Sequence, residues 1–152
     1  MSRSLPSLLI SATLLLAATA PISGAEADFK DDLAKIQGKW KATVGTDDSA
    51  TLWTLDNKGN KTTLTIRSKS GDDLAKLECE FKLERHGKFK AFTYSNLKFL
   101  SGDKEGQTEL TGGKSRSSIY KLEGDSVFHT IGGFREDDEQ APILIRWEKV
   151  KD

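Results

Sequence analysis

The sequence is poor in the side chains that most often bind metals or form covalent cross-links. Its 152 residues include one cysteine, Cys79, and two histidines, His86 and His129. One cysteine cannot form an internal disulfide, and these three residues do not have the spacing of a zinc site. Cys79 lies on the apolar face of the alternating segment Leu77–Leu83, which predicts a buried thiol. We therefore predict no metal, no cofactor and no disulfide framework.

An excess of charge of one sign is also missing. Lysine and arginine together number 23, and aspartate and glutamate also number 23. In the segment Leu74–Glu84, basic and acidic residues share one outward face, which is typical of a solvated surface. The sequence has no basic stripe of the kind that binds nucleic acid, so we predict no nucleic-acid partner.

Familiar catalytic motifs are absent as well. The chain contains no Gly-x-Ser-x-Gly nucleophile motif. Gly113–Ser115 resembles the end of a phosphate-binding loop, but Thr108 stands where that loop requires a glycine. The acidic run Glu136–Glu139 favours a solvated loop over a cation site. Because the sequence offers no nucleophile, base and oxyanion donors in combination, we predict that the protein is not an enzyme.

Long hydrophobic runs are limited to one segment near the N-terminus. Leu8–Ala20 is apolar, but a membrane-spanning helix needs about 20 such residues. Arg3 precedes the run, and small residues follow it up to Ala25 and Ala27. The pattern predicts a secretory signal peptide over residues 1–25, cleaved near Ala25 or Ala27. We therefore expect a protein exported to the periplasm or outside the cell, with no membrane anchor after cleavage.

One short helix is predicted after the signal peptide. In Asp28–Gln37, the residues Phe29, Leu33 and Ile36 form one apolar stripe at helical spacing. An aspartate at the first position suits an N-terminal cap, and Gly38 suits the position just past the end of the helix.

After this helix the hydrophobic period changes from helical to two, which predicts strands. Eight or nine short strands with close turns and no second helix indicate a sandwich or a closed antiparallel barrel. We expect one domain over residues 28–152. The predicted strands are Lys39–Val44, Thr51–Asp56, Lys61–Arg67, Leu74–Glu84, Lys88–Leu100, Gln107–Leu110, Ser117–Leu122, Ser126–Ile131 and Ile143–Val150.

Three stretches carry a family resemblance. Residues 32–44 place a short helix before a Gly-x-Trp motif, residues 119–131 contain Ile-Tyr-x-Leu-x-Gly-Asp, and residues 144–151 read Leu-Ile-Arg-Trp-Glu-Lys-Val-Lys. Together they resemble an uncharacterised family of small exported lipocalin-like domains known mainly from Planctomycetes. The resemblance implies export and an all-β fold, an antiparallel lipocalin-like β-barrel of about eight strands preceded by one short N-terminal helix. It implies no activity.

A wider resemblance to lipocalins rests on Gly38, Trp40 and Arg146. In lipocalins the tryptophan closes one end of the barrel, and an arginine late in the chain packs across it; a cation over an indole ring contributes about 0.5–2 kcal/mol. If Ile145 and Trp147 face inward, however, Arg146 faces outward by alternation. Either the last strand is shifted, or the contact between Trp40 and Arg146 is absent.

Two functions remain open at this point. A barrel of about eight strands has an interior just wide enough for one small ligand or for side chains alone. The first hypothesis is therefore a module that binds a small apolar or amphipathic ligand. The second is a structural or protein-interaction domain with a filled core, in which the polar loop over residues 132–142 contacts an unknown partner. The candidate lining residues are Trp53, Leu77, Phe81, Tyr94, Tyr120 and His129.

Overall fold

The computed structural model describes residues 23–132 and 142–151. Most of the predicted signal peptide and most of the predicted loop over residues 132–142 lie outside these ranges. The elements, in chain order, are α1 (Ser23–Ile36), β1 (Gly38–Val44), the 3-10 helix η1 (Asp47–Ser49), β2 (Thr51–Lys58), β3 (Lys61–Ser68), β4 (Asp73–His86), β5 (Phe89–Ser101), β6 (Thr108–Glu109), β7 (Arg116–Glu123), β8 (Val127–Gly132) and β9 (Ile143–Lys149).

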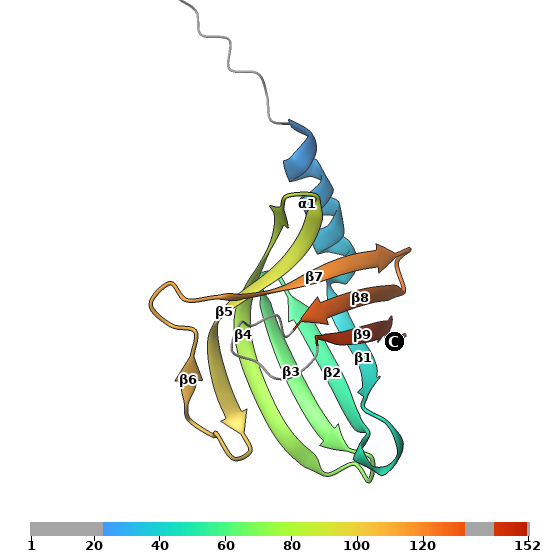
Figure 1. The fold of residues 1–152 in the computed structure, drawn as a ribbon, viewed down its shortest axis with the longest axis vertical. Coiled ribbons are helices and arrows are strands. Elements are labelled where there is room, and N and C mark those ends of the chain that lie inside the picture. The colour runs from blue at the N-terminus through green and yellow to red at the C-terminus, as the bar shows by residue number, and fades with distance from the viewer. Residues whose placement is uncertain (1–22, 133–141, 152) are drawn as a thin grey trace, which may run out of the picture.

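The strands form a closed antiparallel barrel (Figure 1). Each long strand pairs with the next long strand along the chain, and within the described residues the two-residue β6 pairs with β5 alone. The barrel closes where β9 returns to β1, with Trp40 opposite Lys149 and Lys41 opposite Glu148. Closure removes the open sheet edges that invite pairing with other chains. The predicted all-β barrel of eight strands, preceded by one helix, is therefore confirmed.

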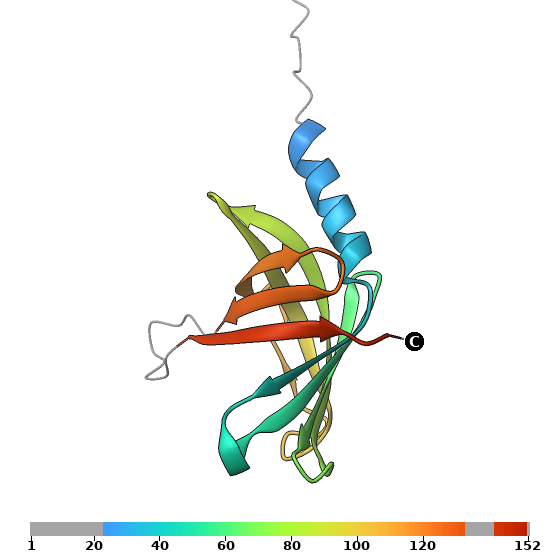
Figure 2. The same cartoon turned by 90° about the vertical axis from the view of Figure 1, so that its right-hand side faces the viewer.

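The barrel has two different ends (Figure 2). Helix α1 lies over the end where β1 begins, which we call the helix end. Because neighbouring strands are antiparallel, β7 begins, β8 ends and β9 begins at the opposite end, which we call the far end. The far end therefore includes Arg116, Gly132 and Ile143.

Helix α1 begins earlier than the sequence predicts. It starts at Ser23 rather than Asp28 and ends at Ile36. Residues 25–27 are Ala-Glu-Ala, and alanine and glutamate are strong helix formers, so the helix continues upstream of the predicted cap. Gly38 then adopts a φ of 91°, a conformation that favours glycine, and turns the chain into β1.

The last turn of α1 is fixed to the barrel by hydrogen bonds to its carbonyl groups. The Trp40 indole donates Nε1–H to the Ile36 carbonyl at 2.8 Å, and the Asn57 side-chain amide donates to the same oxygen at 2.9 Å. The Lys149 ammonium donates to the Lys35 carbonyl at 3.0 Å. The final carbonyls of a helix have no partners within the helix. Here β1, β2 and β9 supply them, which couples the helix to the point of barrel closure.

Trp40 is the most completely enclosed side chain of the core. It is 0% exposed, and the Phe128 ring meets it edge to face at 4.7 Å between centroids. The cation over the Trp40 ring comes from Lys149, whose Nζ lies 5.2 Å from the ring centroid. Arg146 instead lies on the outer face of β9 and pairs with Glu148.

Of the two alternatives left open by the sequence, the second holds: the contact between Trp40 and Arg146 that the lipocalin resemblance implies is absent, and the register of β9 gives the reason. Ile145 and Trp147 both line the interior of the barrel, so alternation turns Arg146 outward. Lys149 has the same parity as Trp147 and stands opposite Trp40 in the closing pair. The cation over the Trp40 ring therefore belongs to Lys149, three residues after Arg146 in the same strand.

A second group of contacts holds α1 against the other side of the helix end. The buried Asp32 carboxylate accepts a hydrogen bond from the Tyr120 hydroxyl at 2.7 Å. It also forms an ion pair with the Lys90 ammonium at 2.9 Å. Arg85 places its guanidinium 5.7 Å from the centroid of the Phe29 ring. These contacts join the helix to β4, β5 and β7, so the helix closes its end of the barrel from both sides.

We predict that Trp40→Phe lowers the free energy of unfolding by about 2 kcal/mol, because it removes a buried hydrogen bond and leaves a small void. Trp53→Phe is the matched control, since the Trp53 indole donates to the half-buried Thr51 hydroxyl and not to the end of α1. Urea denaturation of both variants measures the difference. If the two variants lose the same unfolding free energy, the hydrogen bond from Trp40 to the end of α1 does not have the predicted role.

Candidate functional site

The interior of the barrel is hollow toward the far end. A cavity of about 410 Å³ lies between the strands, within the range of roughly 300–1,000 Å³ that is usual for small-molecule sites. Trp40 is not part of its lining, because the packed core at the helix end separates that ring from the cavity. The barrel is thus filled at one end and hollow at the other.

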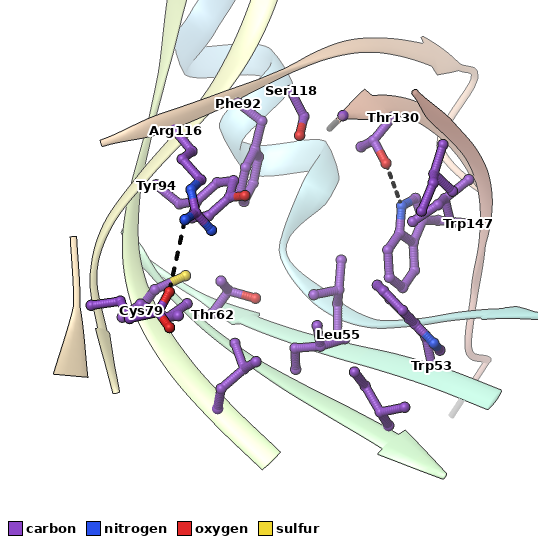
Figure 3. Close-up of a pocket in the computed structure, with 18 of the residues that line it drawn as sticks. Trp53, Leu55, Thr62, Cys79, Phe92, Tyr94, Arg116, Ser118, Thr130 and Trp147 are labelled. Carbon is purple, nitrogen blue, oxygen red and sulfur yellow. Dashed lines mark hydrogen bonds and ion pairs between the residues drawn. The ribbon is translucent and has the colours of Figure 1, made fainter. Parts of the chain in front are cut away.

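Most of the cavity wall is apolar (Figure 3). Alternate residues of each strand point inward, so six strands contribute to a continuous apolar surface. These residues are Trp53 and Leu55 from β2, Leu64 and Ile66 from β3, Leu77 and Cys79 from β4, Phe92, Leu97 and Phe99 from β5, Phe128 from β8, and Ile143, Ile145 and Trp147 from β9.

A bulge in β5 keeps that strand facing the cavity from Phe92 to Phe99. Tyr94 and Leu97 both line the cavity, although strict alternation would turn one of them outward. The register with β4 shifts between Glu78 and Glu80, and Asn96 takes a φ of 52° at this point. The inward parity of β5 therefore changes at Asn96.

A series of aromatic rings runs from the packed helix end of the barrel to the cavity wall. The rings of Phe128 and Trp147 are stacked at 5.9 Å, and those of Trp147 and Trp53 are tilted at 6.4 Å. The indole N–H groups of these two tryptophans are engaged: Trp147 donates to the Thr130 hydroxyl at 3.0 Å, and Trp53 donates to the Thr51 hydroxyl at 2.8 Å. These bonds leave the rings themselves as apolar surface on this side of the cavity.

Thr62 is a buried polar residue of the cavity wall. Thr62 is 4% exposed and lines the cavity, and its hydroxyl oxygen forms no hydrogen bond within the described residues. A buried hydroxyl without a partner costs about 1–3 kcal/mol.

Charged residues gather at the far end of the cavity. Glu109 of β6 accepts an ion pair from the Lys104 ammonium at 2.8 Å, and the Arg116 guanidinium lies 3.8 Å from the same carboxylate. Figure 3 shows Arg116 reaching from β7 into the interior beside Tyr94, toward the wall that holds Cys79. The site therefore combines a long apolar wall with a charged group at one end.

The structure places the six predicted lining residues in different surroundings. Trp53, Leu77 and Tyr94 line the cavity. Phe81 and Tyr120 are not part of the lining: Phe81 is buried and stacks on Phe92 at 4.4 Å, and the Tyr120 hydroxyl bonds to α1. They share the inward parity of their strands but belong to the packed helix end.

The predicted inward position of His129 is wrong. Its neighbours Phe128 and Thr130 line the cavity, so alternation puts His129 on the outer face of β8. There its Nδ1 lies 3.8 Å from a Glu123 carboxylate oxygen. The sequence suggested the opposite because Val127 and Ile131, which share the parity of His129, are apolar; both faces of this strand are partly buried.

Several lining residues were missed from the sequence. Arg116 could have been found by extending the predicted strand over Ser117–Leu122 by one residue, since it has the inward parity of Ser118 and Tyr120. Lys104 and Glu109 lie on a loop and a two-residue strand. No periodic pattern predicts their approach to the cavity.

Within residues 23–132 and 142–151, no group of three or more histidine, cysteine, aspartate or glutamate side chains could hold a metal ion. The part of the chain that the structure describes has no helix long and apolar enough to cross a membrane.

No family model, no curated protein and no solved structure matches this chain. Membership of the lipocalin-like family therefore stays a prediction.

Cys79 gives the cavity wall a measurable pH response. Burial, with smaller contributions from the charges of Glu78 and Glu80, raises the pKa of the Cys79 thiol from 9.0 to about 12. The unfolded chain releases this proton near the ordinary thiol pKa, whereas the folded chain retains it. Stability therefore falls as the pH rises from the lower pKa toward the higher one.

We predict that the wild-type protein loses about 1 kcal/mol more unfolding free energy than Cys79→Ala between about pH 8 and pH 10. Urea denaturation at the two pH values provides the comparison, and the variant cancels the titration of all other groups. Parallel losses in the two proteins would show that the thiol has an ordinary pKa.

Proposed function

We propose that this protein, after export, binds one small apolar or amphipathic molecule inside its barrel. The observation that carries the proposal is the cavity of about 410 Å³ with its largely apolar wall. Burial of apolar ligand surface there gains roughly 25 cal/mol per Å². The closed helix end and the charged far end give the site one apolar and one polar terminus, as an amphipathic molecule requires.

The cavity favours this function over a domain with a filled core. Protein interiors are close-packed, and voids larger than a water molecule are few. The same chain packs its helix end tightly around Trp40 and Phe128, both of which are nearly inaccessible to solvent. A sequence that fills one end of the barrel with aromatic rings and leaves the other end hollow is consistent with space kept for an occupant.

The polar groups of the cavity suit recognition better than catalysis. Trp147 engages the Thr130 hydroxyl, and Lys104 engages the Glu109 carboxylate. Both histidines lie outside the lining, so neither is placed to act as a general base there. We therefore propose binding without chemical conversion of the ligand.

The test is to replace a residue of the cavity wall by one with a larger side chain. Ile66 lines the cavity from β3, and Thr65, its neighbour in the strand, has the opposite parity. We predict that Ile66→Trp weakens binding of n-decanol at least about tenfold, because the larger side chain occupies the space of the ligand. Thr65→Trp, which adds the same side chain outside the barrel, binds decanol as the wild type does.

Isothermal titration calorimetry of the three proteins gives the dissociation constants. The expected wild-type result is saturable binding of one decanol per chain. Failure of the wild type to bind decanol, decanoate or decyltrimethylammonium would contradict the proposed function. Unchanged binding by Ile66→Trp would place the ligand outside this cavity.

A further inference from the structure

We infer that the ligand is an amphipathic carboxylate, with its carboxylate at Arg116 and its apolar chain extending toward Trp147. This inference rests on the proposed function and specifies its ligand class. Lys104, Glu109 and Arg116 are the charged residues among those that line the cavity within the described part of the chain. All three lie at the far end, so the charge of the site is confined to one terminus.

The balance of these charges favours an anion. Two cations face a single carboxylate, which leaves the cavity lining with one uncompensated positive charge. A cationic ligand would have to compete with both bases for Glu109. An anionic ligand supplies the missing negative charge.

Geometry singles out Arg116 as the group that receives the ligand. Lys104 contacts Glu109 directly at 2.8 Å, whereas the Arg116 guanidinium stays 3.8 Å away, longer than a hydrogen bond. The Arg116 side chain is 37% exposed and lines the cavity, so it is partly desolvated and faces the space that a ligand would occupy. A guanidinium presents a planar fork of donors that matches a carboxylate in two parallel bonds.

The loop that carries Lys104 is held in place against the barrel. Gly102 adopts a φ of 92°, and a side chain there would meet the Leu74 carbonyl at 2.5 Å, so the backbone passes closer to β4 than other residues allow. The Gly106 amide donates to the Phe99 carbonyl at 3.0 Å. The Lys104 ammonium lies 5.3 Å from the centroid of the Phe99 ring. Lys104 is thereby positioned to neutralise Glu109 and leave Arg116 to the ligand.

The opposite end of the cavity suits an apolar chain. Leu55, Phe128 and Trp147 form its wall nearest the packed core, and all three are buried. The Trp147 indole N–H already bonds to Thr130. A chain that enters with its carboxylate at Arg116 therefore buries its tail against hydrocarbon and aromatic surface.

The experiment compares three probes with the same apolar chain: decanoate, n-decanol and decyltrimethylammonium. Calorimetry of the wild type is expected to give decanoate a dissociation constant about tenfold lower than that of decanol, as a charge-assisted contact warrants. Arg116→Gln is expected to abolish this preference while decanol still binds. Arg67→Gln is the matched control, since Arg67 is exposed, pairs with Asp73 and is not part of the lining.

A second variant tests the inference through a gain of affinity rather than a loss. Glu109→Gln removes the carboxylate that competes for the two bases, so decanoate is expected to bind several-fold more tightly than to the wild type. A gain of affinity cannot result from misfolding. Weaker binding of decanoate to Glu109→Gln would overturn the inference.

The outcomes separate this inference from the function on which it rests. If none of the three probes binds the wild type, the proposed function fails. Equal affinity for decanol and decanoate, or a preference for decanoate that persists in Arg116→Gln, overturns the assigned head group and leaves ligand binding intact. Tightest binding of decyltrimethylammonium would assign recognition to Glu109 and also overturn the inference.

Discussion

Docking of helix α1 and closure of the barrel both depend on the carbonyl group of Ile36. This oxygen ends helix α1 and accepts hydrogen bonds from the Trp40 indole and the Asn57 amide. Trp40 lies on β1, the strand through which the barrel closes, and stands opposite Lys149 of β9. One buried acceptor thus joins the helix, the first two strands and the closing pair. A buried carbonyl without its partners would cost about 1–3 kcal/mol, so helix docking and barrel closure stabilise each other.

This constraint divides the interior into two parts. Around Trp40 the rings are packed edge to face and the core is closed to solvent. From Phe128 the aromatic contacts continue through Trp147 to Trp53, where they become the wall of the cavity. The packed end supports the hollow end, because Phe128 contacts both Trp40 and Trp147, a residue of the cavity wall. A site built on strands in this way is pre-organised, which reduces the entropic cost of ligand binding.

The sequence predicts the fold better than it predicts the site, and particular residues show why. Strict alternation in Leu77–Leu83 identifies the inward face of β4, and Ile145 and Trp147 do the same for β9. In β8 both faces carry apolar residues, so alternation does not reveal that His129 points outward. The bulge at Asn96 changes the parity of β5, and one asparagine, although it favours a positive φ, is too weak a signal to place a bulge. The cluster at Glu109 depends on the path of a loop that no periodic pattern encodes.

The central claim is that the hollow end of the barrel is a ligand site. Native mass spectrometry of the protein, purified without detergent or organic solvent, tests it most directly. We expect the wild type to carry a reproducible extra mass that is lost on denaturation, and we expect Ile66→Trp, in which the cavity is obstructed, to lack it. An identical extra mass on both proteins would contradict the account, because the bound molecule would then lie outside the cavity.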